Sequence, residues 1–193
     1  MSLTFSPQHL LFNGLHLDVA RTLAKDSLQS LVLSPRFYSG QTRSLDEFTS
    51  RTFEAEDNSK VLGYGLEVLH RLYLSGTPHE GGYFAYGLNY HHFNVEFEKL
   101  GWARQIDAQG LETYHYRYRP FNEIINRWGA TALIGMQRQL SPKPLLFDMY
   151  VGFGYTKSNI SSSYDTVRYD VNAYDFGFTG MRVLGGLKFG IIL

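Results

Sequence analysis

Apolar and polar residues alternate with a period of two along much of the chain. The C-terminal segment shows this most clearly: one face carries Met181, Val183, Leu187, Phe189, Ile191 and Leu193, and the other carries Arg182, Leu184, Gly186, Lys188 and Gly190. Successive side chains of a β-strand point to opposite faces, so this period predicts a strand.

Six further segments repeat the pattern: Leu15–Ala20, Leu31–Tyr38, Val61–Leu74, Phe84–His91, Arg127–Gln137 and Leu145–Thr156. Helical periodicity is weak throughout. Its best candidate, "SLDEFTSRTFEAEDN" from Ser44 to Asn58, is short, polar and typical of a loop. The chain is therefore predicted to be all-β.

The less apolar face of these strands carries mainly glycine, serine, threonine and isolated charges. A soluble lipid-binding barrel would place apolar side chains there, and a water-facing sheet would carry many lysines and glutamates. Small residues with single opposite charges suit the crowded interior of a narrow barrel. The apolar faces are then expected to point outward into lipid.

Short and long connections alternate between the predicted strands. The short ones are Ala24–Leu28, Ser75–Glu80 and Ser141–Pro144, and the long ones are Gly40–Lys60, Lys99–Leu111 and Ser158–Asp175. An even strand count needs one more strand, which Leu3–Phe12 supplies, followed by a hairpin turn at Asn13-Gly14. We predict a single domain over 1–193: an up-and-down antiparallel transmembrane β-barrel of about eight strands, with short periplasmic turns and long external loops.

Composition narrows the possible partners. The 18 basic and 18 acidic residues cancel, so no overall field attracts nucleic acid, and the absence of cysteine removes disulfides and thiolate metal sites. No apolar run approaches the roughly 20 residues of a membrane helix. The segment "MSLTFSPQHL" has no signal-peptide pattern, so we expect either a cytoplasmic chain or a mature form with an added initiator Met.

Over essentially its whole length the chain resembles the small eight-stranded bacterial outer-membrane barrels, the class that includes outer-membrane proteins A and X. The strand set, the alternation of turns and loops, and the ending "LKFGIIL" carry the resemblance. In that family the insertion machinery reads apolar residues at alternate positions back from an aromatic terminus. Leu187, Phe189 and Ile191 match this spacing, but the chain ends on Leu193 instead of phenylalanine.

The predicted interior holds a set of charged and polar side chains: His16, Asp18, Arg36, Glu67, Arg71, Arg127, Asp148, Arg182 and Lys188. Isolated charges are costly in a low-dielectric space, so they must pair or stay hydrated. We expect two or more of the arginines to hold Glu67 and Asp148. A salt-bridged filling of the barrel is the favoured interpretation, and a small hydrated ion path is the alternative.

The stretch "HHFN" from His91 to Asn94 raises an enzymatic alternative, because some outer-membrane lipid A hydrolases are small barrels with a catalytic His and Ser on one strand. Glu96 and Glu98 are nearby carboxylates, but no serine stands at that spacing. Zinc binding by His91, His92 and His115 is a weaker possibility. No catalytic residue, metal or cofactor is predicted.

The stretch "TYHYRYRP" interleaves aromatic and basic side chains: Tyr114, His115, Tyr116, Arg117, Tyr118 and Arg119. Such interleaving occurs in single-strand nucleic-acid binders. Here "NVEFEK" offers Glu96 and Glu98 across the loop, which predicts a hairpin beyond the membrane with cross-strand charge pairs. Lipopolysaccharide phosphates or an envelope protein are the expected partners, and nucleic acid is not.

Aromatic residues near strand ends are expected to form membrane-interface girdles: Phe37, Tyr64, Tyr90, Trp128, Phe153 and Tyr155. The leading hypothesis is a non-enzymatic integral protein of the bacterial outer membrane with a structural or interaction role through its external loops. A soluble lipocalin-like carrier of a small apolar ligand is the second hypothesis. It requires Leu62, Leu66, Val68, Ile134, Met149, Val151, Leu187 and Ile191 to face inward, whereas the membrane barrel requires them to face outward. The third, the lipid A hydrolase, requires a serine or threonine within hydrogen-bond reach of His91 or His92.

Overall fold

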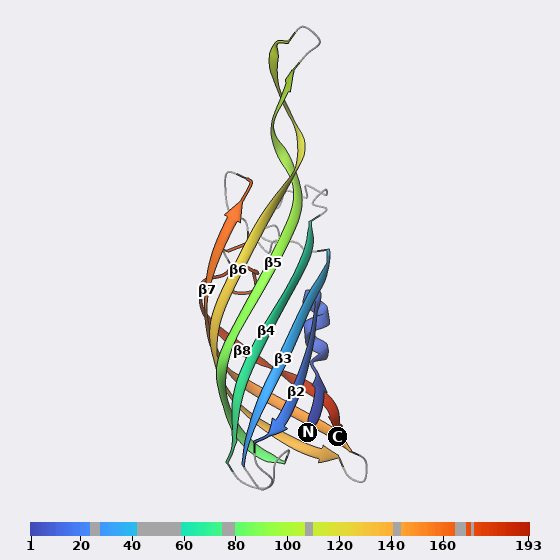
Figure 1. The fold of residues 1–193 in the computed structure, drawn as a ribbon, viewed down its shortest axis with the longest axis vertical. Helices are drawn as coiled ribbons and strands as arrows, with labels where there is room; N and C mark the ends of the chain where they lie inside the picture. The colour runs from blue at the N-terminus through green and yellow to red at the C-terminus, as the bar shows by residue number, and fades with distance from the viewer. Residues whose placement is uncertain are drawn as a thin grey trace.

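The protein is a closed antiparallel β-barrel of eight strands in the order β1 to β8 (Figure 1). The computed structural model describes residues 1–23, 28–41, 59–74, 80–106, 110–140, 144–164, 169–170 and 172–193. The strands are β1 Ser2–Phe5, β2 Gly14–Thr22, β3 Gln29–Gln41, β4 Lys60–Tyr73, β5 Gly81–Ile106, β6 Glu112–Leu140, β7 Leu145–Ser162 and β8 Gly180–Ile192. The up-and-down barrel predicted from the alternation is confirmed.

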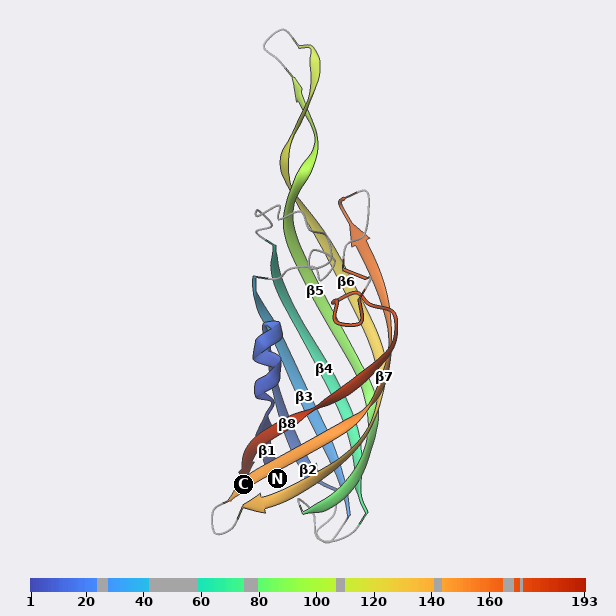
Figure 2. The same ribbon diagram turned by 180° about the vertical axis from the view of Figure 1, so that it is seen from behind.

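The C-terminal strand closes the barrel by pairing with the first strand. Ser2 lies opposite Ile192 and Phe5 opposite Phe189, so both termini lie at the same end of the barrel (Figure 2). Directly opposite residues can be followed from strand to strand around the barrel, and the path that starts at Leu3 on β1 arrives at Met181 on β8. Leu3 itself, however, pairs with Ile191 on β8. This offset is the shear of the barrel, and it means that the strands are tilted relative to the barrel axis. Two residues at the same height on neighbouring strands are therefore shifted by about one residue from direct pairing.

The predicted first strand, Leu3–Phe12, is wrong beyond Phe5. Residues Pro7–Phe12 form a 3-10 helix, η1, with Pro7 near its start, where the missing N–H costs nothing. Asn13 ends η1 in the left-handed region at φ 57°, and its N–H donates to the carbonyls of His9 and Leu10. Asn13 is therefore a helix C-cap, and not the first residue of a hairpin turn.

Two of the predicted connections also differ in the structure. The predicted long loop Lys99–Leu111 is wrong, because β5 continues to Ile106 and β6 begins at Glu112. Strand β7 likewise runs on to Ser162, so the connection to β8 begins later than predicted. The helical candidate Ser44–Asn58 and most of the predicted short turns lie outside the described residues.

The side chains alternate as predicted between the interior and the outer wall. Glycines on the inner face leave room for large rings on neighbouring strands. A Cβ at Gly65 would lie 2.4 Å from the ring of His91, and one at Gly135 would lie 2.4 Å from the Tyr83 hydroxyl. Within the described ranges, no helix is long and apolar enough to cross a membrane.

Candidate functional site

The barrel interior is filled in layers, and its lower end contains a carboxylate-centred cluster. Asp148 is fully buried and accepts hydrogen bonds from Arg71 at 3.3 Å, Tyr83 at 2.7 Å and Gln137 at 2.8 Å. The Arg71 guanidinium also lies 4.2 Å from the centre of the Tyr83 ring, and Tyr73 donates to Gln137 at 2.7 Å. Each polar side chain has at least one specific partner, which offsets much of the cost of burying these charges, although Arg71 Nε and Nη1 are buried without one.

Two further ion pairs lie at and above this level. Lys188 on β8 pairs with Asp18 on β2, and its ammonium lies 4.7 Å from the centre of the Tyr150 ring. Arg36 on β3 pairs with Glu67 on β4, and Glu67 also accepts a hydrogen bond from Thr131 at 2.9 Å. Of the carboxylates expected to bind arginines, Glu67 thus contacts Arg36 and Asp148 contacts Arg71.

The last two arginines contact backbone oxygens of the segment before β8. Arg127 donates to the carbonyl of Phe176 at 2.9 Å and to that of Asp175 at 3.5 Å, and Arg182 donates to that of Ala173 at 3.3 Å. The predicted interior residues are therefore all buried or half-buried within the barrel. Arg36, Arg71 and Lys188 have carboxylate partners, whereas Arg127 and Arg182 donate to backbone carbonyls.

Two apolar layers inside the barrel were not foreseen from the sequence. The lower one contains Ala20, Val32, Leu69, Tyr73, Tyr83, Ala85 and Leu133. The upper one contains Tyr38, Val61, Phe93, Val95, Phe97, Ile125 and Tyr169, with Phe176 packed against it. Tyr169 and Phe176 come from the β7–β8 connection, so part of this connection folds into the upper end of the barrel. The sequence did carry one signal for these layers: their strand residues occupy the alternate positions that point inward.

Histidines form a separate group near η1. His9 on η1 stacks on His16 with ring centres 3.7 Å apart, and a hydrogen bond of 2.9 Å joins His16 to the Tyr38 hydroxyl. The three histidines considered as a weak zinc possibility are not brought together: His91 faces the interior, His92 faces outward and His115 lies on the hairpin. The described residues contain no group of three or more His, Cys, Asp or Glu suited to a metal.

The hydrogen-bond partners of the "HHFN" histidines bear on the hydrolase hypothesis. His92 contacts Asn126 at 2.8 Å, and the Tyr90 hydroxyl donates to the same Asn126 oxygen at 2.9 Å. His91 contacts Arg36 at 3.4 Å. Within the described part of the chain, neither histidine has a serine or threonine among these partners.

The outer wall carries the exposed apolar side chains. The eight residues that discriminate between the two barrel hypotheses all face outward, with Leu62 67 % and Ile134 61 % exposed. Five aromatic residues follow one another on β3 to β7, one per strand: Phe37, Tyr64, Tyr90, Trp128 and Tyr155. The residue directly opposite Tyr64 is His92, which lies two residues above Tyr90 on β5. Because the strands are tilted, this offset brings Tyr64 and Tyr90 to a similar height on the barrel. Phe153 lies two residues below Tyr155, inside the apolar band.

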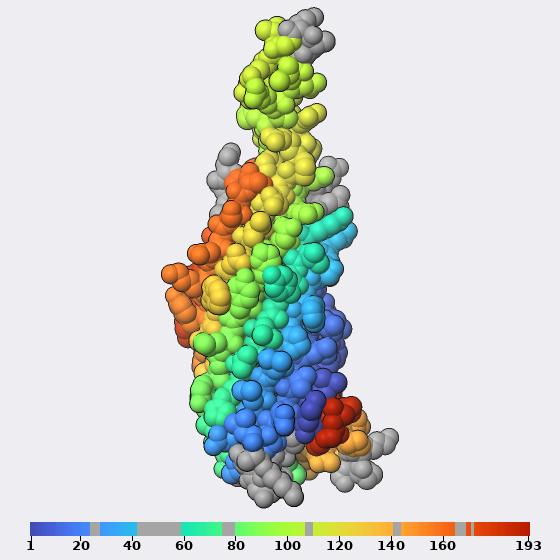
Figure 3. All heavy atoms as spheres, in the orientation of Figure 1, coloured from blue at the N-terminus to red at the C-terminus, as the bar shows by residue number. Residues whose placement is uncertain are grey.

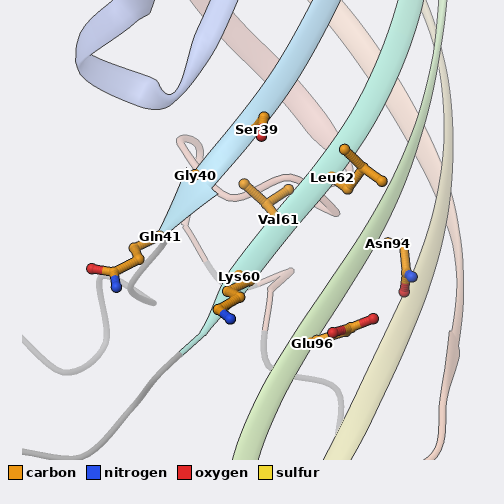
Figure 4. A pocket seen from close by; sticks show the side chains of 8 residues that line it. All are labelled: Ser39, Gly40, Gln41, Lys60, Val61, Leu62, Asn94 and Glu96. Carbon is orange, nitrogen blue, oxygen red and sulfur yellow. The ribbon is translucent and has the colours of Figure 1, made fainter.

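Polar residues replace apolar ones directly above this aromatic band on four of the five strands. Two residues further up, the outward positions are Ser39 on β3, His92 on β5, Asn126 on β6 and Lys157 on β7, whereas β4 keeps the exposed Leu62. A hollow of about 400 Å³ opens at this level, lined by Ser39, Gly40, Gln41, Lys60, Val61, Leu62, Asn94 and Glu96 (Figure 4). On these four strands the outer surface therefore changes from apolar to polar within two residues.

Strands β5 and β6 continue beyond the barrel as a two-stranded hairpin. Pairing with β4 ends at Glu96 and pairing with β7 ends at Glu123. Apart from a hydrogen bond from the Ser163 N–H to the Asn122 carbonyl and the packing of Phe97 at the base, the residues above contact mainly each other. We call this segment, 97–106 with 112–122, the extended hairpin. It projects from one end of the molecule as a narrow arm (Figures 1 and 3).

The extended hairpin has two chemically different faces. Trp102 lies opposite Tyr116 with ring centres 5.3 Å apart, and Leu100 lies opposite Tyr118. The other face carries the basic side chains, with Arg117 opposite Gly101 and Arg119 opposite Lys99. Directly opposite residues share a face of the ribbon. The predicted grouping of Tyr114 to Arg119 is thus split into an aromatic face and a basic face.

The predicted cross-strand charge pairs of this hairpin are wrong in register. Glu96 lies opposite Asn122 and Glu98 opposite Pro120, so neither faces Arg117 or Arg119. The ion pair near the tip is instead formed by Arg104 and Glu112, whose side chains are 56 % and 47 % exposed.

Comparison with known proteins gives no match: no family model matches the chain, and neither does any curated protein or solved structure.

Proposed function

We propose that this chain is a non-enzymatic integral protein of the bacterial outer membrane, built like the small barrels of outer-membrane proteins A and X. Its role is structural or interactive, and the extended hairpin is the part that meets a partner. The observation that carries the proposal is the outer wall, where a continuous set of exposed apolar side chains is bounded by five aromatic residues on five successive strands.

An exposed apolar surface of this size is stable only when another apolar surface or a lipid phase covers it. Monomeric soluble proteins rarely expose contiguous apolar patches beyond a few hundred Å², and a lipid bilayer is the natural cover for a belt that runs around a barrel. Aromatic side chains prefer the membrane–water interface, which suits the position of Trp128 and Tyr155 below the polar residues of the upper wall.

The filled interior argues against a carrier that transports a large apolar ligand. Paired charges and two apolar layers fill the space that a carrier would keep open. The outward orientation of Leu62, Ile134 and Val151 is the opposite of what the lipocalin-like hypothesis requires.

The extended hairpin supports an interaction role. Trp102, Tyr114 and Tyr116 are each more than half exposed, and Arg117 and Arg119 are exposed on the other face. Aromatic and arginine side chains are the residue types most enriched at binding hot spots. Phosphate groups of lipopolysaccharide, or an acidic surface of an envelope protein, would be complementary to the basic face.

Detergent dependence tests the proposal. The chain is purified with and without detergent, and its β signal is followed by circular dichroism beside a gel shift of boiled and unboiled samples. We expect β structure only with detergent or lipid, and faster migration of the unboiled sample. A monodisperse, β-rich protein in plain buffer would refute the membrane assignment.

A further inference from the structure

Three arginines enter the upper interior from three different strands. Arg36 on β3 contacts His91, which lies opposite Arg127 on β6. Arg127 and Arg182 on β8 both donate to backbone carbonyls of the same short segment before β8. Glu67 pairs with Arg36. Among the described residues, Arg127 and Arg182 have no carboxylate partner, and the carboxylates of Asp18 and Asp148 lower in the barrel are engaged by Lys188 and Arg71.

Their contacts leave donors unused. The Nε atoms of Arg36, Arg127 and Arg182 are buried and have no hydrogen-bond partner. Arg127 is only 5 % exposed, and its Nη1 atom reaches neutral backbone carbonyls. A carbonyl dipole accepts a hydrogen bond but does not compensate a full charge, and the Phe93 ring, 5.0 Å from the Arg127 guanidinium, offsets only part of it. Among the described residues, Arg127 and Arg182 therefore lack a counter-ion.

His91 adds one more unused donor at the same level. Arg36 has no acceptor, so the 3.4 Å contact from its Nη1 to His91 Nε2 makes Nε2 the acceptor and assigns the ring proton to Nδ1. That Nδ1 is buried and unpartnered, and the side chain is only 1 % exposed. The region therefore contains several unpaired N–H groups and two arginines that have no carboxylate partner among the described residues. An unpaired acceptor on the same strand as His91, the amide oxygen Asn89 Oδ1, is neutral and cannot compensate their charge.

We propose that this upper interior binds a small inorganic anion of halide size, held by Arg127 and Arg182 with His91 as a further donor. One monovalent anion supplies both the missing acceptor and compensating charge, which neutral water does not. The aromatic residues Tyr38, Phe93 and Phe176 pack together above the arginines and would separate such an ion from solvent. The site is distinct from the extended hairpin and does not depend on the proposed function.

The chloride dependence of unfolding tests this site. The full chain, folded in an uncharged detergent, is unfolded by heat in sodium chloride and in sodium gluconate at equal ionic strength. We expect the midpoint to be about 2–4 °C higher in chloride, because an ion that binds only the folded state stabilises it. Arg127→Met and Arg182→Met should each abolish this difference.

Arg104→Met, which removes a cation from the exposed hairpin pair, is the matched control and should keep the full chloride response. It also corrects for general salt effects, which act on every variant alike. Equal midpoints of the unsubstituted protein in the two salts, or a chloride response that survives in the Met variants, would overturn the proposal.

A bromide crystal supplies a readout that needs no variant to fold. We expect one anomalous peak within hydrogen-bond distance of the Arg127 and Arg182 guanidinium groups. Electron density for water alone between these side chains, without an anomalous signal, would equally overturn the proposal.

Discussion

Strands β5 and β6 are part of the barrel wall up to Glu96 and Glu123, and beyond these residues they pair only with each other. In the wall, the inward side chains of Phe93 and Ile125 are fully buried. On the extended hairpin, Trp102 and Tyr116 are 63 % and 59 % exposed. The same alternation of side chains therefore stabilises the fold in one region and leaves a free surface in the other. Substitutions in the wall should cost stability, and substitutions on the hairpin should change binding.

The largest difference in stability is expected between removing the carboxylate of a buried arginine pair and removing that of an exposed one. Asp148→Ala removes the acceptor of three buried donors and leaves Arg71 uncompensated, so the free energy of unfolding should fall by about 3–5 kcal/mol. Glu112→Ala breaks the exposed pair with Arg104 and should cost less than about 1 kcal/mol. Urea titration in detergent, followed by the gel shift, measures both. Equal losses would contradict the contrast.

The next effect concerns charge on the outer wall. Ile134→Arg places a cation in the apolar belt and should lower the stability of the barrel in vesicles by about 2–4 kcal/mol if the residue lies near the bilayer midplane. Tyr118→Arg makes the same kind of change on the hairpin and should leave folding in vesicles unaltered. The fraction of heat-modifiable protein after refolding into vesicles reports the difference, and comparable yields would argue against a lipid-facing belt.

A smaller effect is expected from filling an interior glycine. Gly65→Ala adds a methyl group 2.4 Å from the His91 ring and 2.9 Å from the Tyr90 carbonyl, and overpacking of this kind costs about 1–3 kcal/mol. Gly82→Ala is the matched control, because its Cβ would meet nothing closer than 3.9 Å. The urea midpoints of the two variants decide whether the rings pack as described.

The smallest change in stability should come from the basic face of the hairpin. Arg117→Ser combined with Arg119→Ser should shift the free energy of unfolding by no more than about 1 kcal/mol, as surface changes usually do. Co-sedimentation with vesicles that contain lipopolysaccharide should fall clearly relative to the unsubstituted chain. Undiminished binding by the double variant would remove the phosphate-binding role of this face.

The wall could be predicted from the sequence because each strand has one apolar and one polar face. The alternation places Leu187, Phe189 and Ile191 on one side and Lys188 on the other without knowledge of any partner. It failed at Pro7–Phe12, where Pro7 and the αL conformation of Asn13 favour a short helix, and His9 of this helix stacks on the inward-facing His16. Local backbone chemistry decided the structure there.

A hairpin beyond the barrel was predicted, but its length and register, and the partners in the upper interior, could not be predicted for a different reason. Residues 99–106 contain few apolar side chains, and their strand forms because 112–119 pairs with them, although Leu100 and Trp102 do alternate with Lys99 and Gly101. The register of that pairing decides that Glu98 faces Pro120 and not an arginine. Similarly, the carbonyl partners of Arg127 come from the connection before β8, about fifty residues further along the chain, a contact that only the folded barrel creates.

The two tryptophans allow the most direct test of the central claim, because Trp128 lies in the aromatic band of the wall and Trp102 on the extended hairpin. The variants Trp102→Phe and Trp128→Phe, each with a single tryptophan, are folded into vesicles of lipids brominated on the acyl chain, and quenching of the fluorescence is measured. The account predicts strong quenching of Trp128 and none of Trp102. Equal quenching of both, or quenching of Trp102 alone, would contradict it.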